Sequence, residues 1–503
     1  MNLIRFAGLC CLCALLPVAV AHAANGTPDE ELNTLGPSRL LLNADGLHDH
    51  WNGIGRIAST KGLHCTATLI DTRSPDSPTA AAAYVLTSGH CISRELGVML
   101  ADEEIEGSVQ FNYFADTTPR SYPLKRVVWS SMQGVDLAIV ELEPTLQSLV
   151  DDGIQPLRLA DTIPAPGRDI LWVGAPLYKD TGHLRMAACS HEPSGEILSP
   201  PWVWRRSVSN RCKDIDTGAS GSPLLIRDSG ELYAVVNLIT LPAASDSTDS
   251  APPGFPPLAH GSNFAMAVTH LQPCFVDGLF NPDPAECHLF PTFSIRFDPV
   301  HGRPKQFAKV RIGEDGTEIY PRWGLSFTAS MPFYRYKTTD SALDCESPIG
   351  YGNVEAAQNA TIDALVDTRI GINWLCIIGL SSADERPSLG LMRNALALAM
   401  ELQPAGPTAE PHVTIEATRF KTYSVRWALD SGMIDYYTVK IGPPETTDCS
   451  DPKGFRRRFG DLVLRARSLP KKICTYAHDV NGQPSQLRED IVTGAMETSA
   501  QQG

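Results

Sequence analysis

Short apolar runs, not long amphipathic stretches, dominate the chain between residues 51 and 287. Glycine, proline, aspartate and serine separate these runs, and helical periodicity is almost absent, which is typical of β-strands. Because no amphipathic helices lie between the predicted strands, we expect a sandwich or a barrel and not a parallel βαβ sheet. The clearest predicted strands are residues 67–70, 84–87, 136–142, 169–174 and 232–240.

A weak internal repeat occupies the chain beyond Cys287. Each copy has a first cysteine, a Pro-x-Gly turn, an apolar run that predicts a strand, and a second cysteine directly preceded by an apolar residue. Features that recur in a fixed order indicate two copies of one β-module. The turn and the strand fall at residues 347–350 and 364–366 in the first copy, and at 451–454 and 462–464 in the second.

The two copies are expected to resemble immunoglobulin or fibronectin type III sandwiches, over residues 291–403 and 404–495. A strand at 413–426 is predicted to open the second copy. Residues 389–402 have a helix-like composition and are either a short helix or the final strand of the first copy. Residues 496–503 are predicted to be a flexible tail.

The N-terminus has the parts of a secretory signal peptide, which we predict over residues 1–23. Arg5 precedes an apolar run at 6–20, and a small-residue cleavage site follows. That run is too short to span a bilayer, so we expect an exported protein, secreted or periplasmic, without stable membrane insertion. Residues 24–50 are polar and acidic, and they are either a removable propeptide or a permanent N-terminal arm.

Length and charge limit the possible partners. The 503 residues predict about three domains, and 39 glycines with 39 prolines are too few for a disordered, low-complexity chain. The 42 lysines and arginines stand against 57 acidic residues, which gives a net charge of −15. Because this charge repels phosphate backbones, nucleic acid is not an expected partner.

Ten cysteines remain once the predicted signal peptide, which holds three of the 13, is removed. An exported protein can form disulfides, although spacing alone does not determine which cysteines pair. Because the ten fall in sequence neighbours, we predict five local bridges. No CxxC or CxxxxH cluster suggests zinc, and neither a metal nor a cofactor is expected. The predicted bridges are Cys65–Cys91, Cys189–Cys212, Cys274–Cys287, Cys345–Cys376 and Cys449–Cys474.

Three short segments carry candidate chemistry, although each one alone reads as an ordinary turn. One holds a histidine beside a cysteine at a strand end, and one holds a serine between glycines in a tight loop. The third has an acid at the mouth of an apolar strand, where it either caps a turn or has a buried partner. The segments are Ser-Gly-His-Cys at 88–91, Val-Asp-Leu-Ala at 135–138 and Gly-Ala-Ser-Gly-Ser-Pro at 218–223.

Taken together, the three segments resemble the trypsin-like serine peptidases of the chymotrypsin fold, in which histidine, aspartate and serine follow in that order. The resemblance covers about residues 51–290. The Gly-x-Ser-Gly-Ser-Pro form is most similar to bacterial secreted members such as glutamyl and lysyl endopeptidases. The resemblance implies an all-β chain, with a double β-barrel domain followed by the two sandwiches, that acts on protein or peptide substrates.

The resemblance also implies a role for each matching residue. Ser220 would attack the carbonyl and form an acyl-enzyme, and His90 would take its proton and later return it to the leaving amine. Asp136 would hold the imidazole in the required tautomer and stabilise the imidazolium. The backbone N–H groups of Gly218 and Ser220 would bind the tetrahedral oxyanion.

Substrate preference is less well marked. Asp214 lies six residues before Ser220, the offset at which trypsin-like enzymes place the acid that binds Lys or Arg side chains. However, glutamyl endopeptidases also have an acid near this offset, and Asp216 stands where trypsins have a pocket cysteine. Ala219 replaces the aspartate that receives a newly cut N-terminus in the digestive members, so activation by that salt bridge is not expected.

Two other functions compete with an active peptidase. A lipase or esterase needs Gly-x-Ser-x-Gly with its histidine last in the chain, whereas Ser222 replaces the second glycine here and His90 comes first. The other alternative is an inactive peptidase fold that binds a cell surface or matrix through its C-terminal modules. Basic residues between 453 and 472 either bind an anionic polymer or form a solvated face.

Overall fold

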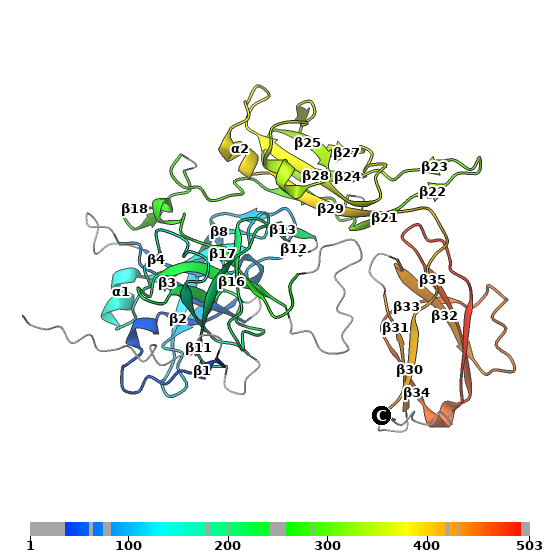
Figure 1. The fold of residues 1–503 in the computed structure, drawn as a ribbon, viewed down its shortest axis with the longest axis horizontal. Helices are drawn as coiled ribbons and strands as arrows, with labels where there is room; N and C mark the ends of the chain where they lie inside the picture. The colour runs from blue at the N-terminus through cyan, green and yellow to red at the C-terminus, as the bar shows by residue number, and fades with distance from the viewer. Residues whose placement is uncertain are drawn as a thin grey trace, which may run out of the picture.

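The structure is a computed structural model, and the predicted signal peptide and C-terminal tail lie outside the residues it describes. Figure 1 shows a double-barrel N-terminal domain in blue to green, a first sandwich in yellow-green and a second sandwich in orange to red. In the described part of the chain, no helix is long and apolar enough to cross a membrane. The described residues are 36–59, 64–73, 82–177, 182–199, 201–240, 258–283, 285–300, 302–418, 422–429 and 433–493.

The first barrel is a closed six-stranded antiparallel sheet in the order β8-β7-β2-β3-β4-β9, with β9 pairing back to β8. Its apolar residues meet inside the barrel, where Ala67, Leu69, Val85 and Val140 are fully buried. Short strands β5 (Met99–Leu100) and β6 (Glu103–Glu104) extend it along β8. The barrel strands are β2 (Ile54–Ser59), β3 (Cys65–Ile70), β4 (Ala82–Thr87), β7 (Gly107–Phe111), β8 (Arg120–Ser131) and β9 (Leu137–Thr145).

The second barrel has the order β11-β10-β15-β16-β17-β14 and closes through a β11–β14 pairing. Helix α1 (Leu146–Asp151) begins the connection from the first barrel, and a hairpin of β12 (Ile197–Ser199) and β13 (Trp202–Trp204) extends from the second. The fold is therefore the predicted double barrel. The strands are β10 (Asp169–Gly174), β11 (Arg185–Pro193), β14 (Ser207–Asn210), β15 (Pro223–Ile226), β16 (Leu232–Ile239) and β17 (Asn263–Ala267).

The described part of the N-terminal arm, residues 36–50, packs onto the barrels. Strand β1 (Arg39–Leu40) pairs with β11 and so adds to the edge of the second barrel. Leu41 is 2% exposed and belongs to the core shared by the two barrels. Removal of this part of the arm would therefore uncover apolar surface.

The first sandwich has a sheet in the order β20-β24-β27 and a facing sheet in the order β21-β29-β28-β25-β26. Residues 389–402, for which a helix or a strand was predicted, form both: helix α2 (Leu389–Arg393) and most of β29. Hairpin β22–β23 (Arg311–Ile312, Glu318–Ile319) extends from the module. The sheet strands are β20 (Ile295–Phe297), β21 (Phe307–Lys309), β24 (Leu325–Ala329), β25 (Phe333–Thr339), β26 (Glu355–Ala356), β27 (Ala360–Ile362), β28 (Gly371–Leu380) and β29 (Leu396–Gln403).

The second sandwich repeats this arrangement, with the sheets β30-β31-β34 and β33-β32-β35-β36. In each module one cysteine follows the central strand, β25 or β32, and is bonded to a cysteine on the neighbouring strand, β28 or β35. The two modules are therefore built on one plan. The strands are β30 (Val413–Ala417), β31 (Thr422–Trp427), β32 (Tyr436–Gly442), β33 (Arg456–Arg458), β34 (Leu462–Arg465), β35 (Lys471–His478) and β36 (Arg488–Val492).

Two predicted strands of the modules differ from the structure. Residues 364–366 form only an isolated bridge, from Leu365 to Arg322. The strand predicted there is β27, which ends two residues earlier, at Ile362. The single strand predicted at 413–426 is a hairpin of β30 and β31. Residues 364–366 are a short apolar run and residues 413–426 alternate apolar and polar residues, and neither pattern fixes where a strand ends or where a turn divides it.

All five predicted disulfides are present: Cys65–Cys91, Cys189–Cys212, Cys274–Cys287, Cys345–Cys376 and Cys449–Cys474. Each sandwich contains one of these disulfides, and the N-terminal domain contains the other three. Disulfides persist in oxidising compartments, so they are consistent with an extracellular or periplasmic protein.

The first sandwich packs closely on the N-terminal domain. Val203 of strand β13 is fully buried in a core otherwise built from first-sandwich residues, including Trp374 and Leu391. The Trp129 ring N–H donates to the carbonyl of Pro291 (3.3 Å), and the Ser294 hydroxyl donates to the carbonyl of Met99 (2.8 Å). Apolar and polar contacts thus hold the two parts together.

A buried ion pair joins the two sandwiches. Lys309 Nζ lies 2.9 Å from Oδ2 of Asp479, and the two side chains are 8% and 1% exposed. The Thr408 hydroxyl donates to the same carboxylate (3.0 Å), and Lys309 also donates to the carbonyl of Pro407 (3.3 Å). Burial opposes ionisation of Asp479, but these hydrogen bonds and the Lys309 charge outweigh it and lower the pKa of Asp479.

Candidate active site

His90 lies where the first barrel faces the second. Strand β4 ends at Thr87, Ser88 follows in an extended conformation, and residues Gly89–Cys91 form one turn of 3-10 helix that carries the histidine. The Cys65–Cys91 disulfide anchors this turn to β3. A ring nitrogen of His90 and both sulfur atoms lie within 4.8 Å of one another, but sulfurs bonded to each other are not thiolate ligands, so this group is not a metal site.

Asp136, directly before β9, is fully buried and uses both carboxylate oxygens on His90. Its Oδ1 accepts the backbone N–H of His90 (2.8 Å), and its Oδ2 lies 2.7 Å from the ring nitrogen Nδ1. A carboxylate only accepts hydrogen bonds, so in the neutral ring the proton is on Nδ1 and Nε2 keeps its lone pair. The arrangement can therefore present Nε2 as a base.

Asn237, in the middle of β16, supports this pair, and the sequence analysis did not identify it. Its side-chain amide donates to the backbone carbonyl of Asp136 and to the Ser88 hydroxyl (3.0 Å). Its Oδ1 accepts the backbone N–H of Met266 (2.9 Å). Asn237 is 6% exposed, so this amide connects the histidine turn, the aspartate and strand β17 inside the protein. The sequence feature that could have identified Asn237 is its place as a side-chain amide inside the apolar strand Leu232–Ile239.

Ser220 lies in the loop before β15, and hydrogen bonds to both barrels hold its backbone. Its carbonyl accepts the N–H of Thr66 (2.8 Å), and the N–H of Gly221 donates to the carbonyl of Val236 (2.7 Å). Gly221 has φ +87°, and a Cβ there would lie 2.0 Å from the Thr66 carbonyl oxygen, so only glycine fits. The Ser220 hydroxyl makes no hydrogen bond to any described residue, His90 included.

Thr66, on β3, is a second supporting residue that the sequence analysis did not identify. Its hydroxyl donates to the carbonyl of Gly218 (3.1 Å) and accepts the N–H of Ala175 (3.1 Å). Thr66 follows Cys65, and the disulfide partner Cys91 follows His90. Covalent bonds and one hydrogen bond therefore lead from the loop of the serine to the turn of the histidine, although the two are far apart in the sequence.

Within residues 217–222, two backbone N–H groups have no partner among the described residues, those of Gly218 and Ser220. Their neighbours are occupied: the N–H of Ala219 donates to the carbonyl of Asp216 (2.9 Å), and that of Thr217 to the Asp216 carboxylate (2.6 Å). Gly218 has φ +89°, and a Cβ there would lie 2.7 Å from Leu177. Two free donors in a fixed loop can bind an anionic oxygen.

Asp214 lies against the N-terminal arm. Its Oδ2 accepts the backbone N–H of Ser38 (2.9 Å) and the Ser38 hydroxyl (3.0 Å). Arg185 in turn donates to the Ser38 hydroxyl (2.8 Å) and carbonyl (2.9 Å). The structure thus brings His90 and Asp136 into direct contact, ties the Ser220 loop to them, and places Asp214 in a network with the arm.

Residues 65–235 match the model of the trypsin-like peptidase domain family. These residues form a trypsin-like peptidase domain. The match spans all three candidate side chains and most of both barrels, so the N-terminal domain is called the peptidase domain below. The resemblance to this family is confirmed, whereas nothing in the match separates the glutamyl from the lysyl type.

Three solved structures are similar to part of this chain. The first is an inactive mutant of Rv3671c from M. tuberculosis, with 20% sequence identity and a TM-score of 0.29, and the match covers 47% of this chain and 91% of that chain. The second is the thermostable serine protease AL20 from an extremophilic microorganism, with 16% identity, a TM-score of 0.30, and coverage of 44% of this chain and 92% of that chain. The third is the protease Anisep from Arthrobacter nicotinovorans, with 17% identity, a TM-score of 0.30, and coverage of 43% of this chain and 90% of that chain. No curated protein sequence matches the chain.

Proposed function

We propose that the chain is an exported serine endopeptidase that cleaves peptide bonds through Ser220, His90 and Asp136. The observation that carries the proposal is the contact between the buried Asp136 carboxylate and both the backbone and the ring of His90. A carboxylate placed on Nδ1 leaves Nε2 as the proton acceptor, which a serine hydroxyl needs at neutral pH.

The reaction follows from these positions. Ser220 Oγ attacks the carbonyl carbon of the substrate while its proton moves to Nε2 of His90, and the carbonyl oxygen becomes an oxyanion. The N–H groups of Gly218 and Ser220 bind that oxyanion. The bond to the leaving nitrogen then breaks as Nε2 returns the proton to the amine, and an acyl-enzyme remains. Water repeats both steps and releases the acid, and Asp136 stays ionised throughout.

The decisive experiment replaces the nucleophile. Ser220→Ala should lower hydrolysis of a peptide substrate by about 10⁶-fold and abolish covalent labelling by a fluorophosphonate. Ser229→Ala is the matched control, because Ser229 is an exposed serine of the same domain whose hydroxyl binds only Glu231. Hydrolysis and labelling that survive Ser220→Ala would reject the mechanism, and an unlabelled, inactive wild-type chain would favour the alternative of a binding protein.

A preference for Lys or Arg before the cleaved bond is the finer part of the proposal, with Asp214 as the acid that binds the basic side chain. Because Asp214 is hydrogen-bonded to Ser38, the substrate would have to replace Ser38. We expect Asp214→Asn to lower kcat/KM for basic substrates by about tenfold or more and to spare neutral ones. Profiling cleavage of a denatured protein mixture measures this directly, and an unchanged profile would remove Asp214 from the specificity pocket.

Export is proposed on the N-terminal segment at residues 1–23, read as a secretory signal peptide. The disulfides support an oxidising destination. N-terminal sequencing of the protein recovered outside the cytoplasm should begin after residue 23, and the same experiment determines whether residues 24–50 are removed. A product that retains residue 1 would contradict the assignment.

A further inference from the structure

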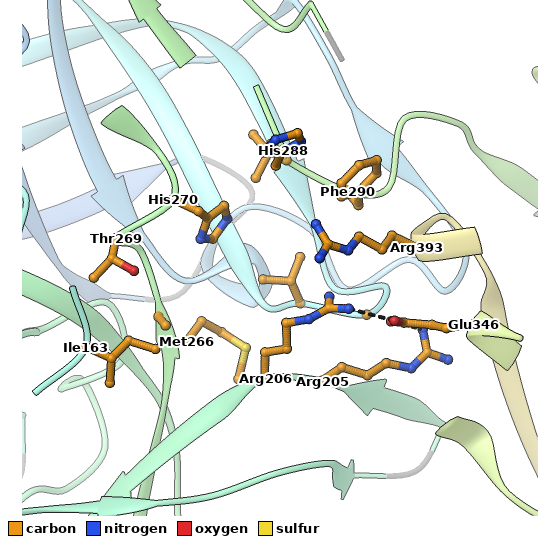
Figure 2. A pocket seen from close by; sticks show the side chains of 14 residues that line it. Ile163, Arg205, Arg206, Met266, Thr269, His270, His288, Phe290, Glu346 and Arg393 are labelled. Carbon is orange, nitrogen blue, oxygen red and sulfur yellow. Dashed lines mark hydrogen bonds and ion pairs between the residues drawn. The ribbon is translucent and has the colours of Figure 1, made fainter. Parts of the chain in front are cut away.

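A cavity of about 290 Å³ lies between the peptidase domain and the first sandwich, and none of the three proposed catalytic side chains lines it. Figure 2 shows cationic side chains converging on it from both parts of the molecule. Arg205, Arg206 and His270 come from the peptidase domain, His288 from the segment that leaves it, and Glu346 and Arg393 from the first sandwich. The volume is at the lower end of the range for small-molecule pockets, roughly 300–1,000 Å³.

Arg205 builds the wall of the cavity. It is 6% exposed and donates to the carbonyls of Ala395 and Ala342, both at 3.2 Å, so it holds the first sandwich against the peptidase domain. Glu346 lies 3.7 Å from it and also accepts from Arg206 (2.6 Å). One carboxylate is thus shared between two guanidinium groups.

Arg393 has no such partner. It ends helix α2, and among the described residues its guanidinium makes neither a hydrogen bond nor an ion pair, while its Nε is buried. In Figure 2 its guanidinium faces the same space as that of Arg206 and the ring of His270. An arginine that reaches into a cavity without an acceptor is short of a counter-charge.

The histidines of the lining cannot supply that counter-charge, because an imidazole is either neutral or cationic. Burial, and then the charges of Arg206, His288 and Arg393, lower the pKa of His270 to about 4. His270 is therefore neutral at pH 7, and its ring has no hydrogen-bond partner among the described residues. Glu196 lies near Arg205 but outside the lining of the cavity, and burial raises the pKa of its carboxyl.

We propose that this cavity binds a small oxyanion. Its three lining arginines and one carboxylate leave a net charge of +2 before the histidines are counted, on a chain whose total charge is −15. Guanidinium groups bind oxyanions with two parallel N–H donors, a geometry that carboxylate and phosphate groups share. The site is an Arg206–Arg393 clamp that receives such a group between the peptidase domain and the first sandwich.

The test measures binding to the full chain by calorimetry at pH 7, with chloride holding the ionic strength constant. The probes are inorganic phosphate, acetate, and one short peptide with either a free or an amidated C-terminus. We expect saturable binding of one ion per chain for phosphate, for the free-carboxylate peptide, or for both. Phosphate alone would identify an inorganic ion, whereas binding of only the unamidated peptide would identify a chain end. No saturable binding of any probe would overturn the proposal.

Variants locate the site. Arg393→Gln should weaken binding by about tenfold or more, because it removes a charge-assisted pair of hydrogen bonds. Arg322→Gln is the matched control, since Arg322 is an exposed arginine of the same module and does not line the cavity. Glu346→Gln should tighten binding, because it removes the only carboxylate of the lining and frees Arg206. Equal affinities for wild type and Arg393→Gln would overturn the proposal.

The outcome does not depend on the proposed peptidase function, because phosphate and acetate have no peptide bond and the peptide probes are measured on the Ser220→Ala chain as well. Conversely, an inactive Ser220→Ala chain should bind the oxyanion as the wild type does. Loss of binding in that variant would show that the ion occupies the active site, and would overturn the assignment to this cavity.

Discussion

The strongest test of the support around His90 and Asp136 is Asn237→Leu, which keeps the branched shape of the side chain and removes its amide. Three hydrogen bonds disappear, namely those to the Asp136 carbonyl, to the Ser88 hydroxyl and from the Met266 N–H. The Ser88 hydroxyl keeps its bond to Val236 (2.9 Å), so two backbone groups lose their partner outright.

Each buried, unsatisfied backbone group costs about 1–3 kcal/mol, and the larger apolar side chain recovers part of that. We therefore expect a net loss of about 2–4 kcal/mol in the free energy of local opening around β16 and β17. Hydrogen exchange at the Met266 amide, followed by mass spectrometry, measures that energy inside the intact chain. On the proposed mechanism, kcat falls more than KM rises, because the carbonyl of the orienting aspartate is released.

Asn237→Asp is the companion variant. It keeps the acceptor for Met266 and loses both donors, so protection at Met266 should recover while hydrolysis stays low. Exchange at Met266 that is within about 0.5 kcal/mol of wild type in the leucine variant would refute the reasoning, because surface substitutions alone have effects of that size.

Three further predictions follow from contacts elsewhere. Lys309→Met leaves the Asp479 carboxylate buried without its cationic partner, at a cost of about 3–5 kcal/mol. Limited proteolysis should therefore cut the connection between the two sandwiches faster than in the wild type. Adding Asp479→Leu to the same chain should restore resistance to the protease. Burial raises the pKa of Glu401 from 4.5 to about 7, so the first sandwich should lose about 3 kcal/mol of stability as pH rises through that interval. Glu401→Gln should flatten this pH dependence in thermal unfolding. Gly221→Ala should abolish hydrolysis while the disulfides still form, since its Cβ has no room beside Thr66; full activity would contradict this.

Much of the fold follows from local patterns. The five strands predicted in the peptidase domain coincide, within a few residues, with β3, β4, β9, β10 and β16. The five disulfides join neighbours in sequence, with separations between 13 and 31 residues. Alternation and proximity along the chain carry enough information for such features.

The supporting residues of the site could not be found in this way. Asn237 and Thr66 act through partners far away in the sequence, and a polar residue inside a strand reads as one that faces solvent. The contact of Asp214 with Ser38 joins residues separated by 176 positions, so no local pattern reports it. Motif matching names the proposed reacting groups, whereas the geometry that holds them requires the folded chain.

Hairpin β12–β13 has a practical consequence for anyone who wants to isolate the peptidase. It places Val203 in the hydrophobic interior of the next module, and Arg205 finds its acceptors there. A fragment truncated at residue 290 would expose the apolar surface around Val203 and leave Arg205 without its acceptors. We would expect such a fragment to aggregate during purification. The minimal recombinant enzyme should therefore extend to about residue 403, because the core of the first sandwich then covers Val203 and supplies the acceptors of Arg205.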